Sequence, residues 1–114
     1  MLEFDSGTAS FTCGTLLAPL QRVDIVGSAA RIMIEIPFNA PPDKPCSVYL
    51  YRRGKTEKIC LDICNQYTVQ GDLFAEAVLT NSEVPIPLED AAANMRVIDA
   101  VAASAAQHTW ISLS

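Results

Sequence analysis

The chain has 114 residues, a length that suits one folded domain and is too short for two. Half of its residues are hydrophobic and 18% are charged, a composition that excludes a disordered tail. The formal net charge of -5 argues against a nucleic-acid-binding protein, because neutralising phosphates requires a concentrated basic face.

The sequence shows no membrane-targeting signal. No stretch approaches the length of an apolar membrane span, and the N-terminus lacks the basic-then-apolar pattern of a secretory signal. The four cysteines carry no indication of an oxidising compartment. We therefore expect a cytoplasmic protein with no membrane partner, whose single domain comprises residues 1–114.

The first half of the chain alternates apolar and polar residues between turn residues, as a run of strands does. Strands are predicted over 8–13, 22–26, 31–36, 46–52 and 57–63, the last two forming a hairpin around Gly54. Within 31–36 the isoleucines share one face of the sheet and the other three residues share the opposite face. The proline-rich segment 37–45 is predicted to be a loop, since proline cannot donate to a ladder.

From Asn65 the apolar period changes to three and four residues, which predicts helices. The first helix carries an apolar stripe made of Val69, Leu73, Phe74, Ala77 and Val78. Asn81 and Ser82 end it, and a second helix begins near Pro87 with acidic residues at the positive end of its dipole. His108 and Thr109 close the second helix, and a last short strand is predicted over 110–113.

Strands followed by helices, without βαβ alternation, predict an α+β fold in two layers: an antiparallel sheet with two helices packed on one face. The other face is then left to water or to a partner. To this open face we assign Thr8, Ser10, Thr12, Met33, Tyr49 and Tyr51. Because its character is mixed rather than charged, we expect a homodimer or higher homo-oligomer that associates through it.

Few residues carry recognisable chemistry. There is no glycine-rich dinucleotide fingerprint, P-loop or nucleophile elbow. His108 is interpreted as a helix C-terminal residue rather than a base. Cys60 and Cys64 lack the two further ligands that zinc would need, so buried thiols are the preferred interpretation. The basic cluster made of Arg52, Arg53, Lys55 and Lys58 is interpreted as a solvated hairpin tip. No catalytic, metal-binding or cofactor-binding residue is assigned.

Three segments together resemble the C-terminal domain of Gfo/Idh/MocA oxidoreductases. The first joins GTASFTC at 7–13 to RVDIVGSAARI at 22–32, where Ala30 stands at the usual second glycine of a turn. The second, NQYTVQGDLFA at 65–75, is similar to the family's Q-Y-x-x-Q-x-x-x-F-A helix start. The third comprises PLED at 87–90, NMRVIDA at 94–100 and Ser104-Ala105. Their order and spacing make the resemblance specific.

The resemblance implies an enzyme that transfers hydride between NAD or NADP and a sugar, polyol or related substrate. The N-terminal Rossmann domain and the E-K-P motif of such enzymes are absent from these 114 residues, and Lys44-Pro45 follows Asp43 rather than glutamate. We therefore expect a substrate-binding and oligomerisation domain that holds no cofactor itself and is inactive alone. Whether this chain is an enzyme stays open.

The resemblance also supplies three candidate substrate-binding residues. Tyr67 matches a tyrosine that reaches the substrate in some members, and its phenol can donate and accept hydrogen bonds. Gln70 lies one turn later on the same face, and Arg22 could contact a ligand from its strand. Each has a local alternative: Tyr67 packed at the helix start with its hydroxyl satisfied, which we favour, and Arg22 paired with an acid.

Two hypotheses of other classes stay open. The chain could be a stand-alone dimeric interaction module that kept the sheet and lost catalysis. It could also be an independent small-ligand binder, for which Tyr67 and a few polar neighbours are the support.

Overall fold

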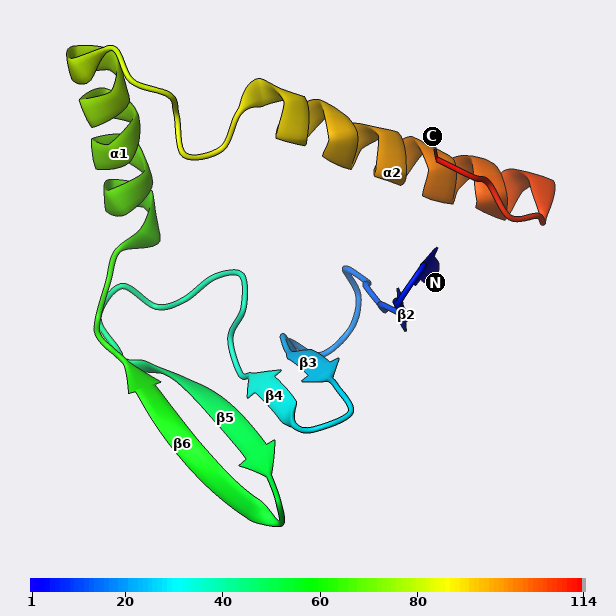
Figure 1. Ribbon diagram of the computed structural model, residues 1–114, viewed down its shortest axis with the longest axis horizontal. Helices are drawn as coiled ribbons and strands as arrows, with labels where there is room; N and C mark the ends of the chain where they lie inside the picture. The colour runs from blue at the N-terminus through cyan, green and yellow to red at the C-terminus, as the bar shows by residue number, and fades with distance from the viewer. Residues whose placement is uncertain (114) are drawn as a thin grey trace. The chain divides into compact units, whose positions relative to one another are not determined.

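A computed structural model of the protein describes residues 1–113. The chain divides into two units, Met1–Cys64, which holds the strands, and Asn65–Ser114, which holds the helices (Figure 1). The strands form two antiparallel sheets. These observations confirm the α+β class. The predicted packing of both helices on one face of the sheet is not shown by the structure and stays a prediction.

The larger sheet has four strands in the order β3-β4-β5-β6, and every neighbouring pair is antiparallel. The strands are β3 (Val23–Val26), β4 (Arg31–Ile34), β5 (Cys46–Arg52) and β6 (Lys55–Leu61). All four were predicted from the alternation, although the predicted 31–36 and 57–63 run two residues past the ends of β4 and β6, and β6 begins two residues earlier than predicted. Pro45 immediately precedes β5, a position where its missing N–H removes no bond within the strand.

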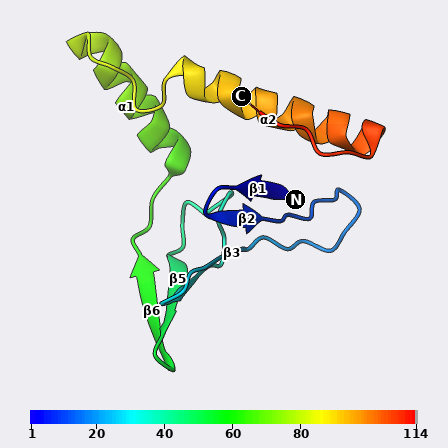
Figure 2. The same ribbon diagram turned by 45° about the vertical axis from the view of Figure 1, so that its right-hand side comes forward.

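The N-terminal strands form a separate sheet, in which β1 (Leu2–Phe4) pairs with β2 (Gly7–Ala9) (Figure 2). The predicted strand over 8–13 is therefore wrong in extent, since it begins at Gly7 and stops after Ala9. The assignment of Thr8, Ser10 and Thr12 to a face of the larger sheet is also wrong. Alternation fixes which face a side chain takes but not the partner strand, and β2 pairs with its nearest neighbour in sequence.

A two-residue turn joins β5 to β6. Arg53 and Gly54 both have positive φ, 51° and 72°, which is the type I′ geometry favoured by the twist of a hairpin. Glycine adopts this conformation without the steric cost that a side chain imposes. The turn fixes the register of the hairpin, in which Arg52 lies opposite Lys55.

The register sorts the side chains of the larger sheet onto two faces. The apolar face carries Val23, Ile25, Ile32, Ile34, Cys46, Val48, Leu50, Ile59 and Leu61, followed toward the hairpin turn by Glu57, Arg52 and Lys55. The mixed face carries Asp24, Val26, Arg31, Met33, Ser47, Tyr49, Tyr51, Thr56, Lys58 and Cys60. This arrangement confirms that Met33, Tyr49 and Tyr51 share a face.

The apolar face lacks a covering layer within the strand unit. Ile25 is 54% exposed and Leu61 is 48% exposed, although both lie on this face. Among residues 1–113, Ala77 is the buried apolar residue and Ser47 the buried polar one. A sheet with one apolar face is stable only when that face is covered by another layer. The strand unit therefore needs a covering layer that it does not itself contain.

The helical unit contains α1 (Gln66–Thr80) and α2 (Leu88–Gln107). Asn81 ends α1 in the left-handed conformation, and Ser82 N–H donates to the Ala77 carbonyl at 3.0 Å, as in a Schellman cap. His108 ends α2 in the same conformation, at the helix C-terminus as predicted. Neither helix of the described chain is long and apolar enough to cross a membrane.

The strand predicted over 110–113 is wrong. These residues have no regular secondary structure and pair with no strand within residues 1–113. The chain instead turns after His108, and the Ser104 hydroxyl donates to the Thr109 carbonyl at 2.6 Å. A strand needs a partner edge, which a short apolar run does not supply by itself.

Candidate functional site

The first turn of α1 is positioned by Asn65. Its backbone is extended, and its side-chain oxygen accepts hydrogen bonds from the N–H groups of Tyr67 at 3.1 Å and Thr68 at 3.3 Å. This N-cap satisfies two donors that the helix itself leaves unpaired. The cap was not predicted, although an asparagine directly before an apolar-periodic segment is its usual signal.

Tyr67 and Gln70 lie three residues apart and therefore on one side of α1. Tyr67 is 68% exposed, and its hydroxyl makes no hydrogen bond to another residue of the described chain. The favoured alternative, a packed tyrosine with a satisfied hydroxyl, is not seen within the helical unit and stays a prediction. Gln70 is also exposed. Together they place one phenol and one amide at the start of α1, and both groups can donate and accept hydrogen bonds.

Arg22 lies in the other unit, immediately before β3. Its Nε is 2.8 Å from Asp24 Oδ2. Asp24 Oδ1 also accepts from Arg31, whose Nε is 2.8 Å and whose terminal nitrogen is 2.6 Å away. Asp24 thus holds two arginines, and the local alternative given for Arg22, pairing with an acid, is confirmed. Its role in substrate binding stays a prediction.

This charge cluster continues across the mixed face. The Arg31 guanidinium lies over the Tyr51 ring, 4.9 Å from the ring centre, and Lys58 Nζ lies 5.7 Å from the centre of the Tyr49 ring. Both distances suit cation–π contacts. Asp24, Arg31 and Tyr51 connect β3 to β5, and the second pair connects β5 to β6. The mixed face is therefore an ordered surface with a cation on each tyrosine.

The cysteines do not form a metal centre in residues 1–113, where no group of three or more potential ligands gathers. All four thiols are free. The interpretation of Cys60 and Cys64 as buried thiols is wrong, because both are exposed. Cys60 lies on β6, an outer strand, where neighbouring side chains flank it on one side only.

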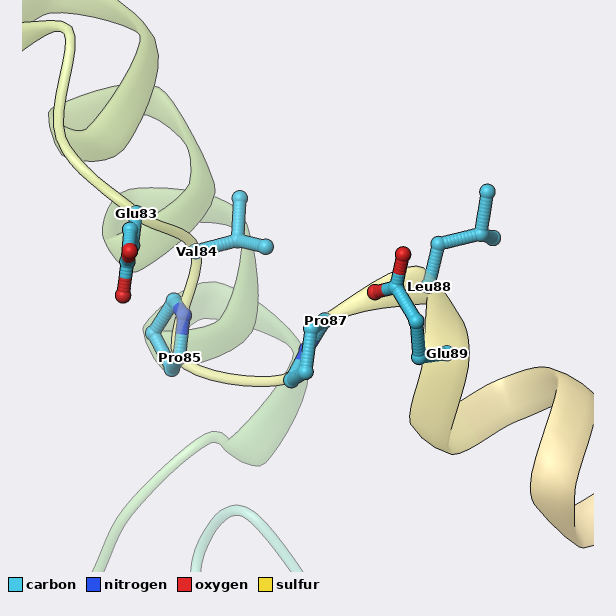
Figure 3. Close-up of a pocket in the computed structure, with 6 residues that line it drawn as sticks. All are labelled: Glu83, Val84, Pro85, Pro87, Leu88 and Glu89. Atoms are coloured by element: carbon cyan, nitrogen blue, oxygen red, sulfur yellow. The ribbon is translucent and has the colours of Figure 1, made fainter.

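An open crevice of about 510 Å³ lies where the chain enters α2 (Figure 3). Its lining consists of Glu83, Val84, Pro85, Pro87, Leu88 and Glu89. Figure 3 shows the prolines along the connecting segment and Glu89 on the first turn of the helix. The crevice contains none of the three predicted substrate residues.

Because Asn65 caps α1, its replacement by alanine is expected to lower the free energy of unfolding by about 1 kcal/mol. Asn65→Ser, which keeps an acceptor oxygen, is expected to cost a few tenths at most. Urea unfolding followed by far-UV circular dichroism measures both. Equal losses in the two variants would show that the hydrogen bonds to Tyr67 and Thr68 do not stabilise the helix.

The chain is similar in sequence to a known protein. It is 30% identical over 116 residues to a protein described as an uncharacterized oxidoreductase of Rhizobium meliloti. The match covers 96% of this chain but 35% of that protein, so the chain spans about a third of its relative's length. No protein-family model matches the chain. No solved structure matches it.

The similarity relates this α+β chain to a part of an oxidoreductase. The rest of the relative's sequence has no matching segment in these 114 residues. The sequence contains no dinucleotide-binding fingerprint.

Proposed function

We propose that this chain is the substrate-binding and subunit-interface domain of a Gfo/Idh/MocA-type oxidoreductase. The complete enzyme transfers hydride between NAD or NADP and a sugar, polyol or related compound. A separate nucleotide-binding domain supplies the cofactor. The observation that carries the proposal is the similarity, which spans nearly all of this chain and about a third of an oxidoreductase.

Within that enzyme, Tyr67 and Gln70 contact the substrate. Both are exposed at a capped helix start, and their groups suit hydroxyl-rich ligands. Arg22 is a third candidate, held beside Asp24. The mixed face is the proposed self-association surface. It carries the cation–π pairs of Arg31 with Tyr51 and of Lys58 with Tyr49, and aromatic residues and arginine are enriched at protein interfaces. Free cysteines accord with a reducing cytoplasm, where we place the enzyme.

The proposal is tested first on the chain as it stands. Mixed with NAD or NADP and a panel of sugars and polyols, it is expected to give no absorbance change at 340 nm above background. Turnover by the chain alone would remove the dependence on a second domain.

The second test replaces the matching third of the Rhizobium meliloti relative with this chain. A chimera that binds the cofactor, seen by fluorescence quenching, is expected to turn over one of the panel compounds. Tyr67→Phe in that chimera is expected to raise KM by about tenfold, because one hydrogen bond to a hydroxyl is lost. Tyr51→Phe, on the sheet, is the matched control. Equal kinetics for the two variants would remove Tyr67 from the substrate site.

A further inference from the structure

β6 has an open edge. It is an outer strand of the larger sheet, and all seven of its residues are exposed. Its inner edge pairs with β5 along its whole length, from Lys55 to Leu61, while no strand of the described chain pairs with its outer edge. Such an edge presents unpaired N–H and C=O groups to which an extended segment can add as a further strand.

The turn end of the β5–β6 hairpin is strongly basic. Arg52, Arg53, Lys55 and Lys58 are four of the eight basic residues of an acidic chain, and Glu57 is the one acid among them. Arg52 and Lys55 lie directly opposite each other, an unfavourable like-charge pair. Both ion pairs found within residues 1–113 are made by Asp24, so no acid of the described chain neutralises these four cations.

The other end of β6 is uncharged. Ile59 and Leu61 both lie on the apolar face, 40% and 48% exposed, with Cys60 between them. Proteins commonly place lysines on an outer strand to prevent pairing. Here the charges are confined to the half near the turn, so they do not block the uncharged half. The edge therefore favours a partner segment that is acidic at one end and apolar at the other.

We propose that the outer edge of β6 binds an extended acidic–apolar segment of a protein partner as an added antiparallel strand. Main-chain hydrogen bonds join the two edges. Apolar residues near the N-terminal end of the segment alternate to face Ile59 and Leu61, and acidic residues at its C-terminal end face Arg52, Arg53 and Lys55. This interaction is separate from the proposed enzymatic activity.

A peptide fits this edge better than nucleic acid does. Residues 59–95 contain six acids and no basic residue, which are Asp62, Asp72, Glu76, Glu83, Glu89 and Asp90. This negative charge and the net charge of -5 repel a polyanion, whereas a short peptide needs only the basic end and the edge. A second copy of β6 fits poorly, because the register that overlaps all seven residues places Lys58 opposite Lys58.

The experiment uses a fluorescein-labelled peptide in which Val alternates with Thr and a run of glutamates follows at the C-terminus. We expect fluorescence anisotropy to show saturable binding that weakens as salt is raised. Arg52→Glu/Lys55→Glu is expected to weaken binding by about tenfold or more, since two attractive pairs become repulsive. Lys44→Glu/Arg96→Glu makes the same change in net charge at exposed sites elsewhere and is expected to bind like the wild type.

Several results would overturn the proposal. An equal loss of peptide binding in the two charge-reversal variants would show that only the net charge of the protein matters. Equal binding by a peptide with proline in place of its threonines would exclude strand addition, because proline cannot donate to a ladder. A single-stranded oligonucleotide that binds more tightly than the peptide would make nucleic acid the partner. Dissociation of a self-associated chain as the peptide binds would assign the edge to a second copy.

Discussion

Asp24→Ala is expected to lower the free energy of unfolding by about 2 kcal/mol, because the carboxylate accepts charge-assisted bonds from two arginines. The figure lies above that of an ordinary surface ion pair for two reasons. The Asp24 side chain is only 25% exposed, and one carboxylate serves both Arg22 and Arg31. Its removal leaves two unpaired cations on one face of the sheet.

The Asp24 variants separate charge from shape. Asp24→Asn keeps an acceptor oxygen of the same size and is expected to lose about half as much stability. Glu35→Ala, at an exposed carboxylate that makes none of the ion pairs of residues 1–113, is expected to change stability by less than about 0.5 kcal/mol. Urea unfolding at low and high salt measures all three. A loss at Asp24 that does not diminish with salt would contradict an electrostatic cause.

The contact of Asp24 with Arg31 could not be predicted from the sequence, whereas its contact with Arg22 could. Asp24 and Arg31 lie in different strands, and they meet because Val26 pairs with Arg31 and Asp24 pairs with Met33. This diagonal contact depends on register, which alternation alone does not specify. The pairing of Arg22 with Asp24 was within reach, since residues two apart on a strand share a face.

Elements with local signals at both ends were predicted well. β5 is bounded by Pro45 and by the turn at Arg53 and Gly54, and α1 lies between two asparagines that cap it. Segments whose structure depends on a distant partner were predicted poorly. Residues 10–13 and 110–113 have the composition of strands but pair with no strand of the described chain. The same reasoning explains Tyr67, whose exposure depends on what packs beside it rather than on its own helix.

The proposed self-association surface gives the second large effect. Met33→Glu/Tyr49→Glu is expected to raise the dissociation constant of the self-associated chain by more than about a hundredfold, as like charges placed against one another cost several kcal/mol. Met33 and Tyr49 lie directly opposite each other on β4 and β5, in the middle of the mixed face. In a two-fold interface the face meets its own copy, so each added charge acts twice. Sedimentation velocity over a range of concentrations measures the change.

The matched control is Thr8→Glu/Ser10→Glu, which adds the same two charges at positions that the alternation assigned to the open face. Thr8 lies in the separate sheet of β1 and β2, and Ser10 lies outside any strand, so self-association is expected to stay within about threefold of the wild type. Far-UV circular dichroism shows whether each variant keeps its fold, and Met33→Gln/Tyr49→Gln, which adds no charge, is expected to weaken association less. An equal loss of self-association in the two glutamate double variants would show that the interface lies elsewhere or that net charge alone weakens association. A wild-type chain that stays monomeric at high micromolar concentration would remove the interface from the proposal, while the substrate role of Tyr67 would still be decided by the chimera.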